Sequence, residues 1–238
     1  MLTETNHWMG IAGTAIDGLL LLRVLTLRLH RIYVFITLAC LISFFFDVVN
    51  LWLTADSKAN VRVFLYSRFL FAVLFPLIGW DVFEEMKAQI SKLRRLATGR
   101  LITGLFFAAI FGFLVSAFAE SNETAGEPAL VVTLGLVLWA GSSTATLAFL
   151  WTLHRGIRAQ SLERPNNTSV WLIYWELSLL SEVLYCFCFL TFPFFKNTVA
   201  DLLTLLFLVY GILITLWCIL KLRRLPTGME STPANASL

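Results

Sequence analysis

Seven long apolar stretches constrain the fold of this chain more than any other feature of its sequence. Each contains about 20 residues, the number that a helix rising about 1.5 Å per residue needs to cross about 30 Å of hydrocarbon. Hydrocarbon offers the backbone no hydrogen-bond partners, so helices are favoured, and strand-like alternation is absent. The sequence therefore predicts an all-α polytopic bundle with spans at approximately 8–28, 32–54, 62–83, 100–119, 129–153, 169–193 and 199–221.

The composition leaves no room for a separate water-soluble domain. Apolar residues make up 58% of the chain and charged residues 14%, against about 45–50% and about 25% in ordinary soluble domains. We expect one membrane domain over residues 1–224, followed by a disordered cytoplasmic tail over 225–238. The basic residues flank apolar runs, so the expected partner is the lipid bilayer and no nucleic acid.

The distribution of lysine and arginine predicts the orientation of the bundle. Thirteen of these residues fall near the span ends on one side, and three, Lys58, Arg62 and Lys196, on the other. Positive residues favour the cytoplasmic side of membrane proteins. The N-terminus is therefore expected outside and the C-terminus in the cytoplasm.

Five charged residues lie at least six residues from either end of a predicted span: Asp17, Asp47, Arg68, Glu176 and Glu182. Each costs at least about 2.5–3.5 kcal/mol at the bilayer centre, which calls for a partner, a water-filled cavity or a function. Asp47 and Arg68 lie at about the same depth, about 10 Å below the outer surface, on two spans joined by a short loop. We expect an Asp47–Arg68 ion pair, with Asp17 and Glu182 converging on it in the outer half of the bundle.

Polar residues recur at helical spacing beside two of these acids. Ser43, Asp47 and Asn50 share one face of the second span, and Ser178, Glu182 and Tyr185 share one face of the sixth. Both faces begin with a Ser-x-x-x-acid-Val frame, which is compatible with an internal repeat of three spans. The candidate ligand- or ion-binding residues are Asp17, Asp47, Asn50, Arg68, Glu182 and Tyr185. Two interpretations stay open: a polar clamp that fixes helix packing, or an outward-opening pocket.

Small residues predict close contacts between helices. Gly10, Gly13 and Gly18 suggest a packing face on the first span, and the segment 139–146, called the small-residue segment below, suggests another on the fifth.

No sequence motif indicates a metal, a cofactor or a catalytic residue. The three histidines lack metal-ligand spacing, and serine-hydrolase and nucleotide-binding motifs are absent. Enzyme activity is not indicated, although an enzyme that uses only intramembrane acids stays open.

The longest predicted cytoplasmic loop, residues 84–99, has apolar residues at helical spacing among charged ones. It is interpreted either as a surface helix that contacts a cytoplasmic protein partner or as a solvated loop that sets topology.

The chain resembles the seven-helix membrane regions of bacterial sensor proteins and small standalone bacterial seven-helix proteins of uncharacterised role. The likeness lies in span number, orientation, and the stretches Tyr66-Ser-Arg68-Phe and Asp81-Val-Phe-Glu84-Glu85. It implies signal reception at a bacterial inner (cytoplasmic) membrane and supplies no catalytic residue, and the chain shows no output domain.

Three functions follow as hypotheses. The first is a non-enzymatic sensor or receptor that binds a small or lipidic ligand in the outer half of the bundle. The second is a small proton- or cation-coupled transporter. The third is an acid-dependent intramembrane enzyme.

Overall fold

The computed structural model describes residues 2–53, 58–86, 129–159, 166–191 and 197–224. This part of the chain is all-helical, and six of the seven predicted helices are present in it. They are α1 (Leu2–Thr26), α2 (Val34–Trp52), α3 (Lys58–Met86), α5 (Ala129–Ala159), α6 (Asn166–Thr191) and α7 (Asn197–Lys221), with a 3₁₀ turn η1 (Leu29–Arg31) between α1 and α2. The predicted span 100–119, nearly all of the loop 84–99, and the tail 225–238 lie outside the described residues.

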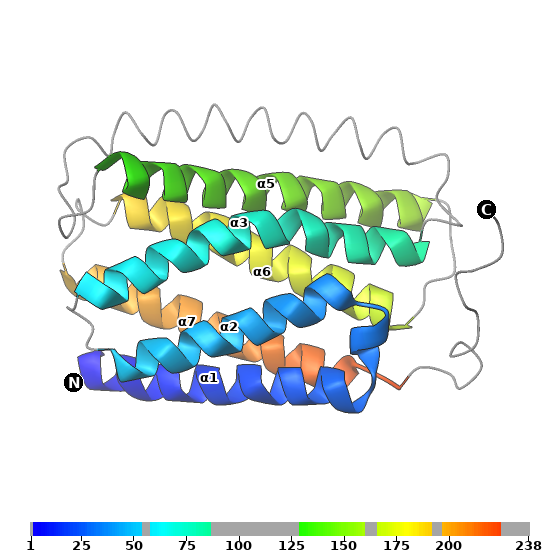
Figure 1. Cartoon of the computed structure of the whole chain (residues 1–238), viewed down its shortest axis with the longest axis horizontal. Helices are drawn as coiled ribbons and strands as arrows, with labels where there is room; N and C mark the ends of the chain where they lie inside the picture. Colours follow the sequence, from blue (N-terminus) through cyan, green and yellow to red (C-terminus); the bar gives the residue numbers. More distant parts are fainter. Residues whose placement is uncertain (1, 54–57, 87–128, 160–165, 192–196, 225–238) are drawn as a thin grey trace.

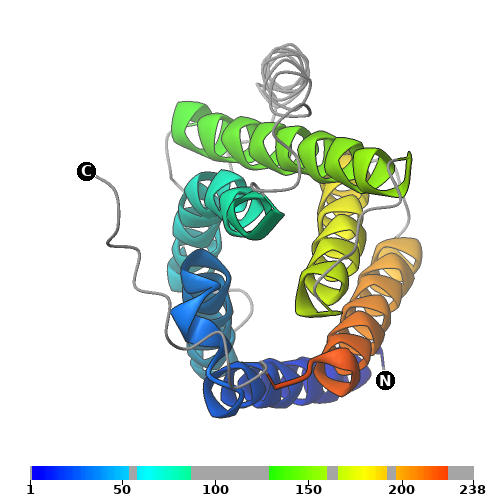
Figure 2. The same cartoon turned by 90° about the vertical axis from the view of Figure 1, so that its right-hand side faces the viewer.

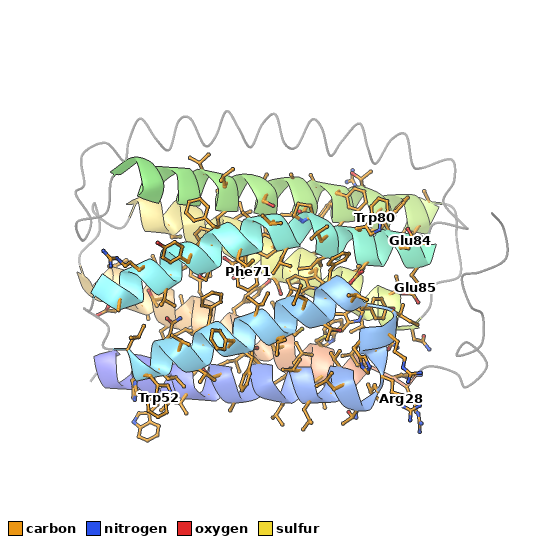
Figure 3. The ribbon with its side chains drawn as sticks, viewed as in Figure 1. Arg28, Trp52, Phe71, Trp80, Glu84 and Glu85 are labelled. Carbon is orange, nitrogen blue, oxygen red and sulfur yellow. The ribbon has the colours of Figure 1, made fainter. Side chains whose placement is uncertain are left out.

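Four of the described helices are long and apolar enough to cross a membrane. The qualifying segments are His7–Thr26, Val34–Trp52, Arg62–Met86 and Asp201–Lys221. These helices also present large apolar side chains outward, such as Trp52, which is 86% exposed and points away from the bundle in Figure 3. Exposed apolar side chains of this size are costly in water and favourable against lipid.

The six helices form a closed ring, which Figure 2 shows from one end and Figure 1 from the side. Each helix packs against its two neighbours in the order α1, α2, α3, α5, α6, α7 and back to α1. Helices α3 and α6 also contact each other across the ring. The ring of six helices surrounds an interior space, which side chains fill in some places and leave open in others.

Helices α3 and α5 approach each other closely at two glycines. A Cβ atom on Gly79 would lie 3.3 Å from Phe149, and one on Gly135 would lie 3.1 Å from Phe69. The Ser142 hydroxyl donates a hydrogen bond to a backbone carbonyl of α3. The prediction that the small-residue segment packs closely against another helix is confirmed.

One half of the ring interior is densely packed. We call it the packed half; it contains the turn between α1 and α2, the C-terminal end of α3 and the N-terminal end of α6. Its side chains that are at most 1% exposed include Val24, Leu29, Tyr33, Ile36, Ile78, Val82, Met86, Trp171 and Leu222. The opposite half, the open half, contains the N-terminal part of α1 and the C-terminal part of α6.

Asp81 of α3 caps the N-terminus of α2 in the packed half. The residue before α2, Tyr33, makes no side-chain cap of its own. Instead, the Asp81 carboxylate accepts a hydrogen bond from the backbone N–H of Ile36 at 2.9 Å. A carboxylate satisfies the unpaired N–H groups of a helix start and suits its positive dipole end.

Further hydrogen bonds tie helices together at the same end. Glu85, one turn after Asp81, accepts from the hydroxyls of Tyr33 and Thr168, so it joins α3, the start of α2 and α6. The Asn167 side chain donates to the backbone oxygen of Arg223 at 2.8 Å and accepts from its N–H at 2.9 Å. These contacts close the packed half, where Figure 3 shows Glu85 at the same end as Arg28.

Candidate functional site

The open half of the ring encloses a cavity of about 590 Å³. Its walls come from α1, α2, α3, α6 and α7, and all six candidate residues line it: Asp17, Asp47, Asn50, Arg68, Glu182 and Tyr185. Helices far apart in sequence therefore bring the predicted polar residues together. Their role in binding stays a prediction.

Arg68 of α3 forms an ion pair across the ring with Glu182 of α6. Its Nη1 atom lies 3.0 Å from Glu182 Oε2. The guanidinium carbon also sits 4.5 Å from the ring centroid of Phe64 and 4.2 Å from that of Trp139. Two aromatic faces and one carboxylate thus hold the cation in place, and both kinds of contact stabilise a guanidinium in a low-dielectric setting.

The Asp47–Arg68 ion pair that we expect from the sequence is not formed, because Arg68 pairs with a different acid. Asp47 is near enough to Arg68 for an electrostatic interaction, yet the contact partner of Arg68 is Glu182. Equal depth on neighbouring helices does not fix the direction of a side chain around the helix axis. Arg68 points across the ring, toward α6, rather than toward α2.

Asp47 instead forms a carboxyl pair with Asp17 of α1. The two carboxyl groups lie close enough to interact directly, and a hydrogen bond between two carboxyl groups requires that at least one of them is protonated. The Ser43 hydroxyl donates to Asp17 Oδ2 at 3.4 Å. The pair therefore holds one negative charge in the wall of the cavity when a single proton is shared.

The two polar faces predicted from helical spacing both line the cavity. Ser43, Asp47 and Asn50 lie in the α2 wall, and Ser178, Glu182 and Tyr185 lie in the α6 wall. The Tyr185 ring packs against Trp139 and Phe207, with centroids 6.3 and 5.4 Å away.

Sequence reasoning missed several lining residues. Tyr174 and Trp175 of α6 and His7 of α1 also line the cavity. Tyr174 falls four residues before Ser178, so the same helical spacing could have extended the α6 face by one turn. No comparable signal marks Trp175 or His7.

The predicted glycine packing face on α1 is wrong at Gly13. Gly13 lines the cavity, and a Cβ atom placed on it would meet no atom within 4 Å. Gly18 does lie against a side chain, with Phe44 2.9 Å from its would-be Cβ. A glycine inside an apolar helix can accommodate either a neighbouring helix or an open space, and its position in the sequence does not distinguish them.

Glu176, the fifth intramembrane charge of the sequence analysis, is separate from the cavity lining. Its Oε2 lies 2.7 Å from Nδ1 of His154 on α5. His154 lies on the neighbouring helix, and both side chains are largely buried.

The arrangement suits binding better than metal chemistry. In the described residues, no group of three or more His, Cys, Asp or Glu side chains could hold a metal ion. The cavity combines an ion pair, a carboxyl pair, hydroxyl groups and aromatic walls, the mixture of apolar surface and few polar groups that is typical of sites for small organic molecules.

Comparison of the chain with protein-family models, with curated proteins and with solved structures gives no match.

Proposed function

We propose that this protein is a non-enzymatic integral membrane receptor or sensor that binds a small organic ligand in the cavity. The cavity itself supports this proposal, because it gathers all six candidate residues and is closed toward the packed half by tightly packed side chains. A pocket with one closed end suits recognition, since a ligand can enter and leave but has no path onward.

We also propose the finer architecture: seven spans, an outside N-terminus, a cytoplasmic C-terminus and a place in the bacterial inner membrane. The four helices that can cross a membrane and the unequal distribution of lysine and arginine support it. In this orientation the cavity opens outside and the packed half faces the cytoplasm.

Helix α3 offers a route from ligand to cytoplasm. It carries Arg68 in the cavity and Glu85 in the packed half, and it leads directly into the predicted partner-binding loop 84–99. A ligand that changes the electrostatic surroundings of Arg68 would act on the same helix that carries Glu85.

The rival function is a proton- or cation-coupled transporter. The hydrogen-bonded carboxyls of Asp17 and Asp47 favour it, because a pair that shares one proton can exchange it for a cation. Alternating access would then be required, with the cavity open to each side of the membrane in turn.

Cysteine labelling separates the two functions. The variant Ser178→Cys, in a background with the native cysteines replaced by alanine, is exposed to a membrane-impermeant maleimide in spheroplasts and in inverted membrane vesicles. A receptor predicts labelling from outside alone. Arg224→Cys, exposed at the opposite end, serves as the control for labelling from inside, and the buried Leu172→Cys as the unreactive control.

The other outcomes contradict the proposal in different ways. Labelling of Ser178→Cys from both sides would favour the transporter. Labelling from inside alone would overturn the proposed orientation. No labelling from either side, with the Arg224→Cys control reacting, would show that the cavity is closed to water and would overturn the receptor.

A further inference from the structure

We propose that the cavity takes a small organic cation, an amine with an apolar body, with its ammonium group between Asp17 and Asp47. This inference rests on the proposed binding function and adds the chemical class of the ligand. It is carried by three properties of the cavity taken together: charge, volume and the identity of its walls.

The charges that line the cavity leave a negative excess. Glu182 neutralises Arg68 at 3.0 Å, so the two remaining acids of the lining, Asp17 and Asp47, have no basic contact of their own among the described residues and add negative charge whenever they ionise. A cation balances this charge. An anion would have to displace Glu182 from Arg68 and approach two further carboxyl groups, which like-charge repulsion opposes.

The volume favours an organic molecule over a bare ion. A cavity of about 590 Å³ lies within the range of about 300–1,000 Å³ found for sites of drug-sized ligands. An inorganic ion or a proton needs only a small fraction of this space. The cavity therefore matches a ligand with a body of many atoms attached to its charge.

Aromatic side chains form much of the wall away from the acids. Phe71 lies on α3 near the middle of the bundle in Figure 3, and it packs against Phe75, with ring centroids 5.7 Å apart. Trp175 of α6 faces Phe75 across the ring at 6.5 Å, and all three line the cavity. Aromatic faces attract organic cations and also bind apolar groups, whereas a strongly hydrated metal ion gains little from them.

The α1 wall leaves room beside the acid pair. Gly13 lies one turn before Asp17, and a Cβ atom on it would meet nothing within 4 Å. A ligand whose ammonium group contacts Asp17 can therefore lie along α1 without a clash. The same space makes Gly13→Leu a suitable variant, because it adds a side chain on the cavity wall where the first added atom meets no packed contact.

The test compares three probes of nearly equal size on the purified full-length protein in detergent: 2-phenylethylamine, 2-phenylethanol and phenylacetate. We expect 2-phenylethylamine to raise the thermal unfolding midpoint in a saturable way, with an apparent Kd at least tenfold below those of the other two. Asp47→Asn and Gly13→Leu should each weaken amine binding at least tenfold. Asp201→Asn on α7, the same change at an acid that does not line the cavity, should leave the Kd unchanged.

The outcomes separate failure of the ligand class from failure of the binding function. If phenylacetate or 2-phenylethanol binds as tightly as the amine and Gly13→Leu abolishes that binding, the cavity binds ligands but the cation assignment is wrong. Amine binding that survives both Asp47→Asn and Gly13→Leu would place the ligand elsewhere and overturn the inference. If no probe shifts the midpoint at millimolar concentration, the inference and the proposed function both fail.

Discussion

The ion pair between Arg68 and Glu182 makes the sharpest prediction about stability. We consider the variants Arg68→Gln and Glu182→Gln, singly and together, and the parallel set with Asp47→Asn in place of Glu182→Gln. A double-mutant cycle isolates the energy that two side chains share, because changes elsewhere cancel. The two cycles therefore ask which acid is the partner of Arg68.

The expected energies follow from the geometry. Hydrogen bonds to charged groups contribute about 1.5–3 kcal/mol, and breaking a fully buried pair costs about 3–5 kcal/mol. The side chains of Arg68 and Glu182 are 19% and 32% exposed, so screening lowers the expected coupling to about 1–3 kcal/mol. Asp47 makes no ion-pair contact with Arg68, so the coupling energy between Asp47 and Arg68 should stay below about 1 kcal/mol.

The single variants should also differ. Arg68→Gln removes the ion pair and the contacts with Phe64 and Trp139, each worth about 0.5–2 kcal/mol. Glu182→Gln removes only the ion pair and leaves Arg68 near Asp47. We therefore expect Arg68→Gln to lower the free energy of unfolding by about 2–4 kcal/mol and Glu182→Gln by about 1–2 kcal/mol.

Unfolding is followed by far-ultraviolet circular dichroism as sodium dodecyl sulfate is titrated into dodecyl maltoside micelles. If the Arg68–Asp47 coupling exceeds the Arg68–Glu182 coupling, Arg68 pairs with α2 after all and the cross-ring assignment is wrong. If Glu182→Gln is neutral or stabilising, Glu182 is not needed for packing, and the polar clamp loses its main support.

Two further predictions concern helix packing, and both use the same unfolding assay. Asp81→Ala should lower the free energy of unfolding by about 1–2 kcal/mol, because the start of α2 loses its cap; Glu84→Ala, at an exposed site on the same helix, should cost less than about 0.5 kcal/mol, and equal effects would contradict the capping role. Gly13→Ala should stabilise α1 by about 0.5–1 kcal/mol, whereas Gly79→Ala, with Phe149 at 3.3 Å, should gain less or destabilise. If Gly79→Ala instead stabilises the protein more than Gly13→Ala does, the open space lies beside Gly79 on α3 and not beside Gly13 on α1.

Much of the architecture could be predicted because lipid restricts it so strongly. The apolar runs place the six described helices, and the spacing of Ser43, Asp47 and Asn50 correctly places these residues on one face. Both inferences use only the helical repeat and the length of a span. They fix where a residue lies along a helix and which neighbours on that helix share its face.

The partners across the ring could not be predicted in the same way. Pairing Arg68 with Glu182 requires the order of helices around the ring and the rotation of each helix, which depend on packing between segments far apart in sequence. The short loop between α2 and α3 makes Asp47 look like the natural partner. Gly13 shows the same difficulty, because the sequence does not say whether its face meets a helix or a cavity.

The roles of the acids at the end of α3 could not be predicted for a different reason. Asp81 falls near the end of the predicted span 62–83 and Glu85 in the predicted loop 84–99, where charges usually indicate only contact with water. In the structure Asp81 caps α2, and Glu85 binds Tyr33 and Thr168. A cap supplied by another helix leaves no local pattern, because the capping residue Asp81 lies 45 positions after Ile36, whose N–H it accepts.

In the proposed receptor, helix α3 would connect the cavity to the packed half. Arg68 and Glu85 are 17 residues apart on it, which is about 25 Å along a continuous helix at about 1.5 Å per residue. In this proposal, a cation bound at Asp17 and Asp47 would offset the charge of Asp47 near Arg68, which would leave Glu182 as the main electrostatic partner of Arg68. The resulting shift of α3 relative to α2 would act on the contacts that Asp81 and Glu85 make with the start of α2. A ligand in the open half would therefore alter the packed half without crossing it.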